Sequence, residues 1–190
     1  MAVVELPLYL VRHGESEWNA QRLIQGQTPH PALTARGREQ ALAAAMSIRD
    51  DLSGPGLAVA VVTSSDLVRA VQTAGILGAV LGGTLRTDPR LREQHLGSWQ
   101  GLSAEQAGVG EASTSVGFTG GESGQDVRAR MSEVIEALDR SVVQVLVSHG
   151  RAIRQAVGHA TGVAEPQARG ITVRNGAVAR WSQGRIDWLQ

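Results

Sequence analysis

Two residue types that often carry chemistry in proteins are missing from this sequence of 190 residues, cysteine and lysine. Without cysteine the chain forms no disulfide bond, offers no thiolate nucleophile and binds no metal through thiolates. Without lysine it forms no Schiff base, and all 18 basic residues are arginines. An anion site in this protein must therefore be built from guanidinium groups, which suit bidentate contacts to phosphate or carboxylate.

Excess charge and long apolar segments are also lacking. The 18 basic and 18 acidic residues give a formal net charge of zero and form no block of one sign. We therefore expect neither nucleic acid nor a membrane surface as the main partner. The first 14 residues carry no basic leader, and their apolar run contains Glu5 and is too short to span a membrane. These features predict a cytoplasmic protein.

The length and an apolar share of 42% are typical of one globular domain, which we predict for residues 1–190. Continuous apolar runs predict strands at 8–11, 57–63, 84–87 and 142–147. Apolar residues at helical spacing predict helices at about 34–49, 67–81, 123–138 and 152–159. Strands that alternate with helices favour an α/β fold, a three-layer α/β/α sandwich with a mostly parallel central sheet. The alternating stretch 171–182 predicts an antiparallel edge hairpin that turns at Asn175-Gly176.

The stretch RHGESEWN at residues 12–19 directly follows the first predicted strand. An imidazole such as that of His13 can attack phosphorus if neighbouring cations, here Arg12, keep it unprotonated. Asn19 can add a hydrogen bond to a phosphoryl oxygen. An Arg-His-Gly tripeptide on its own is more often a surface turn, so the interpretation depends on the other motifs.

Two more motifs follow predicted strands. Arg69 lies in the first turn of a predicted helix, where the helix N-terminus favours anions. His149 follows the strand at 142–147, and a protonated imidazole there can donate a hydrogen bond to a phosphoryl group. Ligands of parallel sheets bind at the carboxyl ends of the strands, so His13 and His149 can face one pocket.

Transfer of a phosphoryl group from an ester to His13 also requires a proton donor for the leaving oxygen. A carboxylic acid beside an anion site can protonate a leaving alkoxide and then activate water. Glu93, in the stretch LREQHLGSWQG at residues 91–101, is the first candidate, and Glu105 and Glu122 are weaker ones among which the residues alone do not decide. The spacing of the histidines offers no metal-ligand signature, so we expect no metal. Three histidines are expected to be structural: His30, His95 and His159.

Taken in this order, the four motifs resemble those of the histidine phosphatase superfamily, also called the phosphoglycerate mutase-like superfamily. The resemblance runs from about Leu8 to Arg154. It implies an α/β/α sandwich and a two-step phosphoryl transfer that uses neither a metal nor another cofactor. By position in the motifs it implies a nucleophile, His13, a phosphate pocket of Arg12, Arg69 and His149, and a proton donor, Glu93. It also implies phosphate or substrate contacts from Asn19, Gln25, Gly26 and Gly150.

Two departures from the family pattern affect the expected function. The family often continues from its Gln-Gly pair to an acidic residue and Pro-Leu-Thr, whereas this chain reads GQTPHPALT, with His30 and an extra Ala32, which can reshape the pocket rim. The segment between Glu93 and His149 is shorter than in the cofactor-dependent mutases. A shorter cover admits water more easily, which favours hydrolysis. Residues 103–124 are either a surface loop or a lid over the pocket.

We therefore predict a phosphomonoesterase that acts on a small phosphorylated metabolite. Three other functions stay open. A phosphoglycerate mutase would retain its phosphoenzyme, and a catalytically silent module that binds phosphorylated ligands would lack the nucleophile or the acid, although His13 and Glu93 are both present. A metal-binding α/β protein would lose its activity to a chelator. Neither the physiological substrate nor the oligomeric state can be inferred from the sequence.

Overall fold

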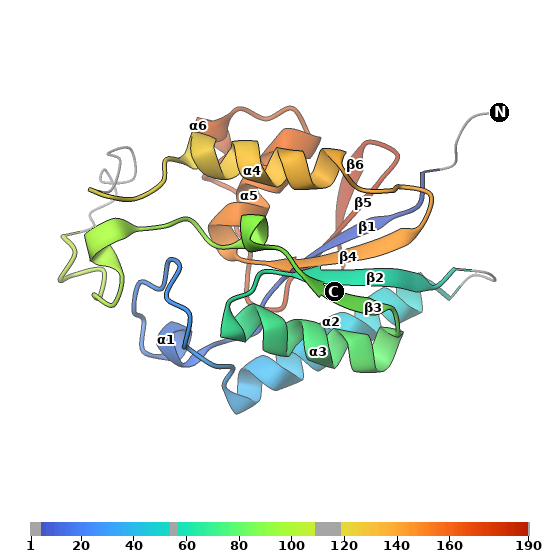
Figure 1. Cartoon of the computed structure of the whole chain (residues 1–190), viewed down its shortest axis with the longest axis horizontal. Coiled ribbons are helices and arrows are strands. Elements are labelled where there is room, and N and C mark those ends of the chain that lie inside the picture. Colours follow the sequence, from blue (N-terminus) through green and yellow to red (C-terminus); the bar gives the residue numbers. More distant parts are fainter. Residues whose placement is uncertain (1–4, 54–56, 109–118, 190) are drawn as a thin grey trace.

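A mixed sheet of six strands forms the central layer (Figure 1). The computed structural model describes residues 5–53, 57–108 and 119–189. Its strands are β1 (Leu8–Arg12), β2 (Val59–Ser64), β3 (Thr84–Thr87), β4 (Val143–Ser148), β5 (Val178–Ser182) and β6 (Arg185–Leu189). They are ordered β3-β2-β4-β1-β5-β6. The first four are parallel, whereas β5 is antiparallel to β1 and β6 to β5, which confirms the predicted mixed sheet.

Helices cover both faces of this sheet. They are α1 (Glu17–Ala20), α2 (Ala35–Asp51), α3 (Val68–Leu81), α4 (Gly124–Glu136), α5 (Gly150–Ala160) and α6 (Glu165–Ala168), with single 3-10 turns at Pro89–Leu91 and Gly97–Trp99. The pair α2 and α3 lies on one face, and α4, α5 and α6 lie on the other (Figure 1). The three-layer α/β/α sandwich is therefore confirmed. No helix in the described ranges is both long and apolar enough to cross a membrane.

Alternate side chains of β1 enter two separate apolar clusters. Tyr9 and Val11 pack with residues of α2 and α3, whereas Leu8 and Leu10 pack with residues of α4 and α5. Successive strand residues point to opposite faces of a sheet, and these four are at most 1% exposed. A strand covered on both sides is apolar at every position, which explains the continuous run from which β1 was predicted.

The edge hairpin turns at a different place from the predicted one. β5 and β6 are joined by Gln183 and Gly184, whose φ angles of 52° and 73° are left-handed, as a two-residue hairpin turn requires. Asn175 and Gly176 instead precede β5, and the amide of Gly176 donates to the carbonyl of Arg12 at 3.1 Å. The chain does turn at Asn175-Gly176, where the amide of Ala177 donates to the carbonyl of Arg174 at 3.0 Å. The prediction that this turn joins the two hairpin strands is wrong, because the pair contacts the end of β1.

Two glycines allow the loop after β1 to approach α2 closely. A Cβ atom on Gly14 would lie 2.0 Å from the carbonyl oxygen of Gly37, and one on Gly37 would lie 2.0 Å from that of Glu15. Thr34, the predicted N-cap, accepts a hydrogen bond from the amide of Gly37 at 3.0 Å. The backbone that follows His13 is therefore fixed against the first turn of α2.

We expect Gly37→Ala to lower the free energy of unfolding by about 1–3 kcal/mol, because the new methyl group forces the two backbones apart. Gly75→Ala is the matched control, since Gly75 is an exposed residue within α3 with no atom near its Cβ position. It should raise stability by up to about 1 kcal/mol through helix propensity. Urea denaturation measures both changes, and equal effects would contradict the close contact.

Candidate active site

The two histidines predicted to share a pocket follow neighbouring parallel strands. Arg12 of β1 pairs in register with Ser148 of β4, and the amide of His13 donates to the carbonyl of Ser148 at 3.0 Å. The rings of His13 and His149 therefore meet edge to face, with centroids 5.0 Å apart and planes inclined by 61°. Both residues are at most 2% exposed.

The position of the hydrogen on His13 follows from its contacts. Its Nδ1 lies 2.7 Å from the carbonyl oxygen of Gly14, and because that oxygen can only accept, Nδ1 must carry the hydrogen. Burial, and after it the charges of Arg69 and Arg12, hold the pKa of His13 well below its ordinary value. The neutral ring therefore has its lone pair on Nε2, which is the form that nucleophilic attack requires.

His149 is completely buried, and neither of its ring nitrogens has a hydrogen-bond partner among the described residues. Burial, followed by the charge of Arg69, holds its pKa well below the ordinary value. A buried N–H group without an acceptor is unfavourable by about 1–3 kcal/mol. An anionic oxygen near the two rings would provide the missing acceptor.

Two arginines next to the histidines form no ion pair with a carboxylate of the described residues, although the charge of Glu93 acts on both. Arg69 is completely buried, and its Nη1 and Nη2 donate to the carbonyls of Thr28 and Gly26, both at 2.8 Å. Arg12 donates from Nη1 to the carbonyl of Val173 at 2.6 Å. The buried Nε atoms of both arginines have no hydrogen-bond partner in the part of the chain that is described. Burial lowers the pKa of Arg69 to about 10, so its guanidinium group is charged at neutral pH. Burial also lowers the pKa of Arg12.

A cavity of about 180 Å³, called here the first cavity, lies against these side chains. Its lining residues are Arg12, His13, Asn19, Leu23, Ile24, Gln25, Gly26, Arg69, Glu93, Leu96 and Arg151. Two of the predicted contact residues do not line it. His149 lies against the ring of His13, and Gly150 begins α5 beside the guanidinium of Arg12, where a Cβ atom would lie 3.5 Å from Cζ.

Glu93 is the carboxylate on the wall of the first cavity. Its Oε1 accepts from the amides of Gln94 and Ala152 at 3.0 and 3.1 Å, and its Oε2 accepts from the amide of Arg151 at 3.1 Å. Two of these amides belong to the first turn of α5, where free N–H groups favour a negative charge. The strand end that supplies His149 therefore also positions Glu93. Glu105 is exposed and does not line the cavity.

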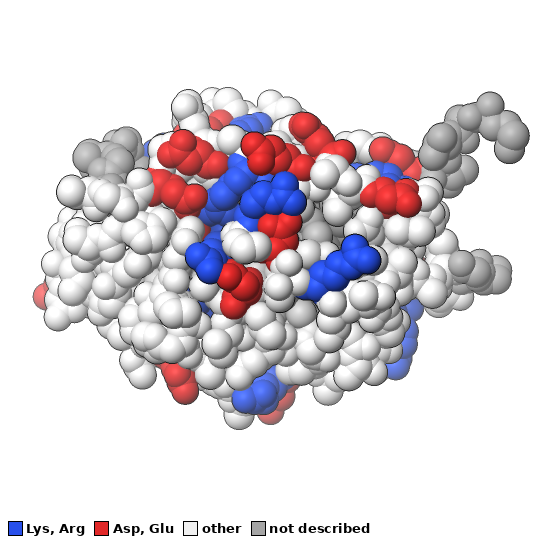
Figure 2. All heavy atoms as spheres, viewed as in Figure 1, with Lys and Arg blue, Asp and Glu red and all other residues white. Residues whose placement is uncertain are grey.

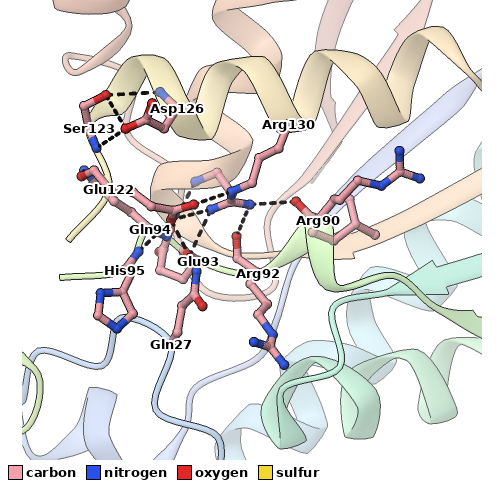
Figure 3. A network of polar contacts seen from close by, with 12 residues as sticks. Gln27, Arg90, Arg92, Glu93, Gln94, His95, Glu122, Ser123, Asp126 and Arg130 are labelled. Atoms are coloured by element: carbon pink, nitrogen blue, oxygen red, sulfur yellow. Dashed lines mark hydrogen bonds and ion pairs between the residues drawn. The ribbon is translucent and has the colours of Figure 1, made fainter. Parts of the chain in front are cut away.

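Glu122, the other weaker acid candidate, belongs to a network around Arg130 of α4 (Figure 3). Arg130 contacts the Glu122 carboxylate at 2.9 and 3.0 Å. Its Nη1 donates to the carbonyls of Arg90 and Arg92, both at 2.6 Å, and its Nη2 donates to that of Glu93 at 3.0 Å. Arg130 thus holds the backbone that carries Glu93. This role could not be predicted from the sequence, because the partners of Arg130 are carbonyl groups about 40 residues away.

A second residue that the sequence analysis missed holds Asn19. The side-chain amide of Asn175 donates to the carbonyl of His13 and to Oδ1 of Asn19, both at 3.1 Å. Oδ1 of Asn19 also accepts from the amide of Ser16 at 3.2 Å. Because its oxygen is used in these contacts, Asn19 has its NH₂ group left to donate into the cavity. The sequence signal, Asn175-Gly176, was interpreted as a hairpin turn.

The sequence model of the histidine phosphatase superfamily (branch 1) matches residues 8–188. The chain belongs to this family. The probable phosphoglycerate mutase GpmB of Erwinia tasmaniensis is 34% identical, and the alignment covers 97% of this chain and 88% of that protein. The protein of the same name from Salmonella choleraesuis is 33% identical, with the same coverage.

Solved structures of this fold are also similar. The mycobacterial glucosyl-3-phosphoglycerate phosphatase complexed with VO3 has a TM-score of 0.78 and 31% identity, with 97% of each chain covered. A structure described as mycobacterial hydrolase 1 has a TM-score of 0.79 and 30% identity, covering 97% of this chain and 96% of the other. Relatives of this chain are thus named as mutases and as phosphatases, and either activity fits the family.

The remaining histidines lie outside the first cavity. His30 packs against Trp18, with ring centroids 5.3 Å apart. His95 donates its amide to Glu122 at 2.8 Å, and His159 lies 3.4 Å from the Glu136 carboxylate. No three His, Asp or Glu residues of the described ranges are grouped to hold a metal ion. Part of the possible lid, 109–118, lies outside the described residues, so the lid stays a prediction.

The depressed histidine pKa values predict how stability depends on pH. Below about pH 6.5 the unfolded chain binds protons that the folded chain excludes, so the free energy of unfolding falls by up to about 1.4 kcal/mol per pH unit for each histidine. We expect a shallower fall between pH 6.5 and 5 for His149→Gln than for the wild type, measured by urea denaturation in phosphate-free buffer. His30→Gln controls for the loss of a surface histidine. Equal slopes for His149→Gln and the wild type would contradict a neutral, buried His149.

The network around Arg130 gives a second prediction. Arg130→Lys keeps the charge but cannot reach all the carbonyl groups, so the segment with Glu93 loses its fixed position. We expect kcat for p-nitrophenyl phosphate to fall by about tenfold or more, with a smaller change in KM, because misplaced catalytic groups slow the chemical step. Glu122→Gln leaves the contacts of Arg130 to the carbonyl groups intact, so its kcat should fall less than that of Arg130→Lys. An unchanged kcat in Arg130→Lys would refute this positioning role.

Proposed function

We propose that this chain is a metal-independent phosphomonoesterase that transfers the phosphoryl group of a small phosphorylated metabolite first to Nε2 of His13 and then to water. One observation carries the proposal. A neutral, buried imidazole, two guanidinium groups that form no ion pair among the described residues and one carboxylate surround one cavity. Glu93 is the one carboxylate beside the two guanidinium groups, and a phosphate dianion in that cavity would supply the rest of the negative charge.

The first step in this proposal is binding. The phosphate accepts hydrogen bonds from Arg12 and Arg69, and the free NH₂ group of Asn19 contacts a third oxygen. His149, behind the ring of His13, acquires its missing acceptor when a phosphoryl oxygen approaches the two rings. The anion also favours protonation of His149, since a nearby opposite charge raises a histidine pKa. Binding and charge stabilisation are the main contributions of a protein to phosphoryl transfer.

The second step is transfer to the protein. The lone pair of Nε2 on His13 forms a bond to phosphorus while the bond from phosphorus to the ester oxygen breaks. Glu93, protonated at this stage, gives its proton to the departing oxygen, so the alcohol leaves without charge. The hydrogen bond from Nδ1 of His13 to the carbonyl of Gly14 keeps the ring oriented throughout.

Hydrolysis is the third step. The Glu93 carboxylate takes a proton from a water molecule, whose oxygen attacks phosphorus as the bond to Nε2 breaks. Inorganic phosphate forms, His13 regains its lone pair, and Glu93 is protonated for the next cycle. The same carboxyl group can serve both steps because the amides of α5 hold it beside the cavity in one place.

A cofactor-dependent phosphoglycerate mutase is the second candidate, favoured by the names of the curated relatives. We prefer hydrolysis because the segment between Glu93 and His149 is shorter in sequence than in the cofactor-dependent mutases, and a shorter cover admits water more easily. A non-catalytic module that binds phosphorylated ligands is less consistent with the site, because His13 and Glu93 both line the cavity.

The charge distribution supports a small ligand over nucleic acid. On the face shown in Figure 2, acidic side chains lie next to basic ones, without a broad region of one sign. An extended polyanion requires a continuous basic surface. The cytoplasmic location stays a prediction.

Phosphate release from p-nitrophenyl phosphate, with a chelator present, tests the proposal. We expect the wild type to remain active and His13→Ala to lose at least about a thousandfold in kcat, because the nucleophile is removed. His30→Ala, outside the cavity, is the matched control. Release that His13→Ala leaves unchanged would refute the role of His13, and loss of wild-type activity in chelator would refute metal independence.

The mutase alternative has its own test. The wild type is incubated with 3-phosphoglycerate, with and without 2,3-bisphosphoglycerate, and free phosphate is measured alongside 2-phosphoglycerate. Hydrolysis predicts that phosphate forms faster than the isomer and that the bisphosphate is not required. Isomer formation that depends on the bisphosphate and exceeds phosphate release would identify a mutase.

A further inference from the structure

A polar side chain is buried in helix α3, next to the loop that carries His13. Thr73 is completely buried and lies four residues after Arg69, which is buried on the same helix. Residues four apart lie one above the other on one face of a helix. The hydroxyl group of Thr73 is therefore enclosed one helical turn beyond an arginine that lines the first cavity.

This hydroxyl group joins two segments of the active site. It donates to the carbonyl of Arg69 at 2.8 Å and accepts from the amide of Gly14 at 3.2 Å. A hydroxyl group has one hydrogen to donate and lone pairs with which to accept, so both bonds can form at the same time. One oxygen atom thus connects the helical turn of Arg69 with the residue that directly follows His13.

Gly14 transmits this contact to the nucleophile. Its amide donates to Thr73, and its carbonyl accepts from Nδ1 of His13 at 2.7 Å. Gly14 is buried, and a buried N–H group without an acceptor is unfavourable. Loss of the Thr73 hydroxyl would therefore favour a shift of the Gly14 backbone, and the carbonyl that orients the His13 ring belongs to this residue.

The backbone contacts of His13 itself lead to other parts of the fold. Its amide donates to the carbonyl of Ser148 at 3.0 Å, at the end of β4. Its carbonyl accepts from the side chain of Asn175 at 3.1 Å, in the segment before β5. These two bonds fix His13 relative to the sheet, whereas Thr73 fixes the same loop relative to α3 and Arg69.

Packing alone does not explain a threonine at this position. The neighbouring buried residues of α3 are apolar, and Ala70, Ala74 and Leu77 belong to the core cluster on this face of the sheet. A buried hydroxyl group is unfavourable unless it is hydrogen-bonded, and threonine has a lower helix propensity than alanine. The two hydrogen bonds of Thr73 are what distinguish it from an apolar residue of the same shape.

We propose that Thr73 is a positioning residue for phosphoryl transfer, whose hydroxyl group sets the place of the His13 ring relative to the guanidinium of Arg69. This inference rests on the proposed function, in which Arg69 holds the phosphoryl group that Nε2 of His13 attacks. Attack requires the reacting atoms to lie about 3–3.5 Å apart and in line. Groups on separate segments keep such a distance only if the segments are joined.

Removal of the hydroxyl group without a change of shape tests this role. Thr73→Val replaces the hydroxyl by a methyl group, and Thr73→Ser keeps the hydroxyl. We expect kcat of Thr73→Val for p-nitrophenyl phosphate to fall by about tenfold or more, with a smaller change in KM, because the arginines still bind phosphate while the nucleophile is misplaced. Thr73→Ser should keep most of the wild-type kcat.

Thr161→Val is the matched control. The hydroxyl group of Thr161, at the end of α5, donates to the carbonyl of Val157 at 2.8 Å, which is the same type of local bond that Thr73 forms with Arg69. Thr161 does not line the first cavity, so kcat should be unchanged. If Thr73→Val fails to fold, as judged by circular dichroism, Thr73→Ser and Thr73→Ala supply the comparison, since these two side chains differ only by the hydroxyl oxygen.

Binding of orthovanadate provides a measurement without turnover. Vanadate adopts the five-coordinate geometry of phosphoryl transfer and bonds to the attacking nitrogen, so its affinity follows that of the transition state. We expect the affinity of Thr73→Val for vanadate, measured by calorimetry, to fall by about the same factor as kcat. Its affinity for inorganic phosphate should fall less, because phosphate forms no bond to His13.

Three results would overturn the positioning role: a wild-type kcat in Thr73→Val, an equal loss of kcat in Thr73→Ser and Thr73→Val, or equal losses of affinity for vanadate and phosphate. His13→Ala separates these results from the proposed function. If His13→Ala loses phosphate release while Thr73→Val keeps it, the proposed function stands and the role of Thr73 alone is refuted. If His13→Ala keeps phosphate release, the proposed function is refuted and the role of Thr73 falls with it.

Discussion

The in-register parallel pairing of β1 with β4 is the constraint on which the active site depends. Because Arg12 lies opposite Ser148, the next residues of both strands leave the sheet at one place, and the rings of His13 and His149 meet. Helix α5 begins directly after His149, and its first backbone amides hold Glu93. A slip of this register by one residue would turn each side chain of β1 to the opposite face of the sheet. It would also move His13 away from both His149 and Glu93.

Buried positive charge that forms no ion pair among the described residues is the second common feature of the site. Arg12, Arg69 and Arg154 each have a buried Nε atom without a partner in the described chain, and His149 has two such nitrogens. These groups lower the stability of the folded protein when no anion is bound, and they favour the binding of anions. The two apolar clusters on either face of the sheet offset that cost. The arrangement is preorganised, since backbone carbonyls of Gly26, Thr28 and Val173 already hold the guanidinium groups.

Much of the fold was predictable because the spacing of apolar residues in the sequence reflects which side chains are buried. β1 and β4 are apolar at nearly every position, as strands covered on both faces must be. The histidines that follow them lie ring to ring, although only His13 lines the first cavity. The Asn175-Gly176 pair was misassigned because a left-handed turn has the same local signature whether it joins two strands or contacts a strand end. The role of Arg130 was not predictable, since nothing in the local sequence distinguishes an arginine that binds distant carbonyl groups from any other arginine of a helix.

The sequence by itself determined the elements, the family and the motif residues, because hydrophobic period and short motifs are local properties of the chain. Tertiary structure decided which carboxylate faces the first cavity, that Glu122 instead pairs with Arg130, and that Asn175 orients Asn19. It also decided that Nε of Arg154 is buried without a hydrogen-bond partner among the described residues. These properties depend on distances between segments far apart in sequence, which only the packing of helices on the sheet establishes.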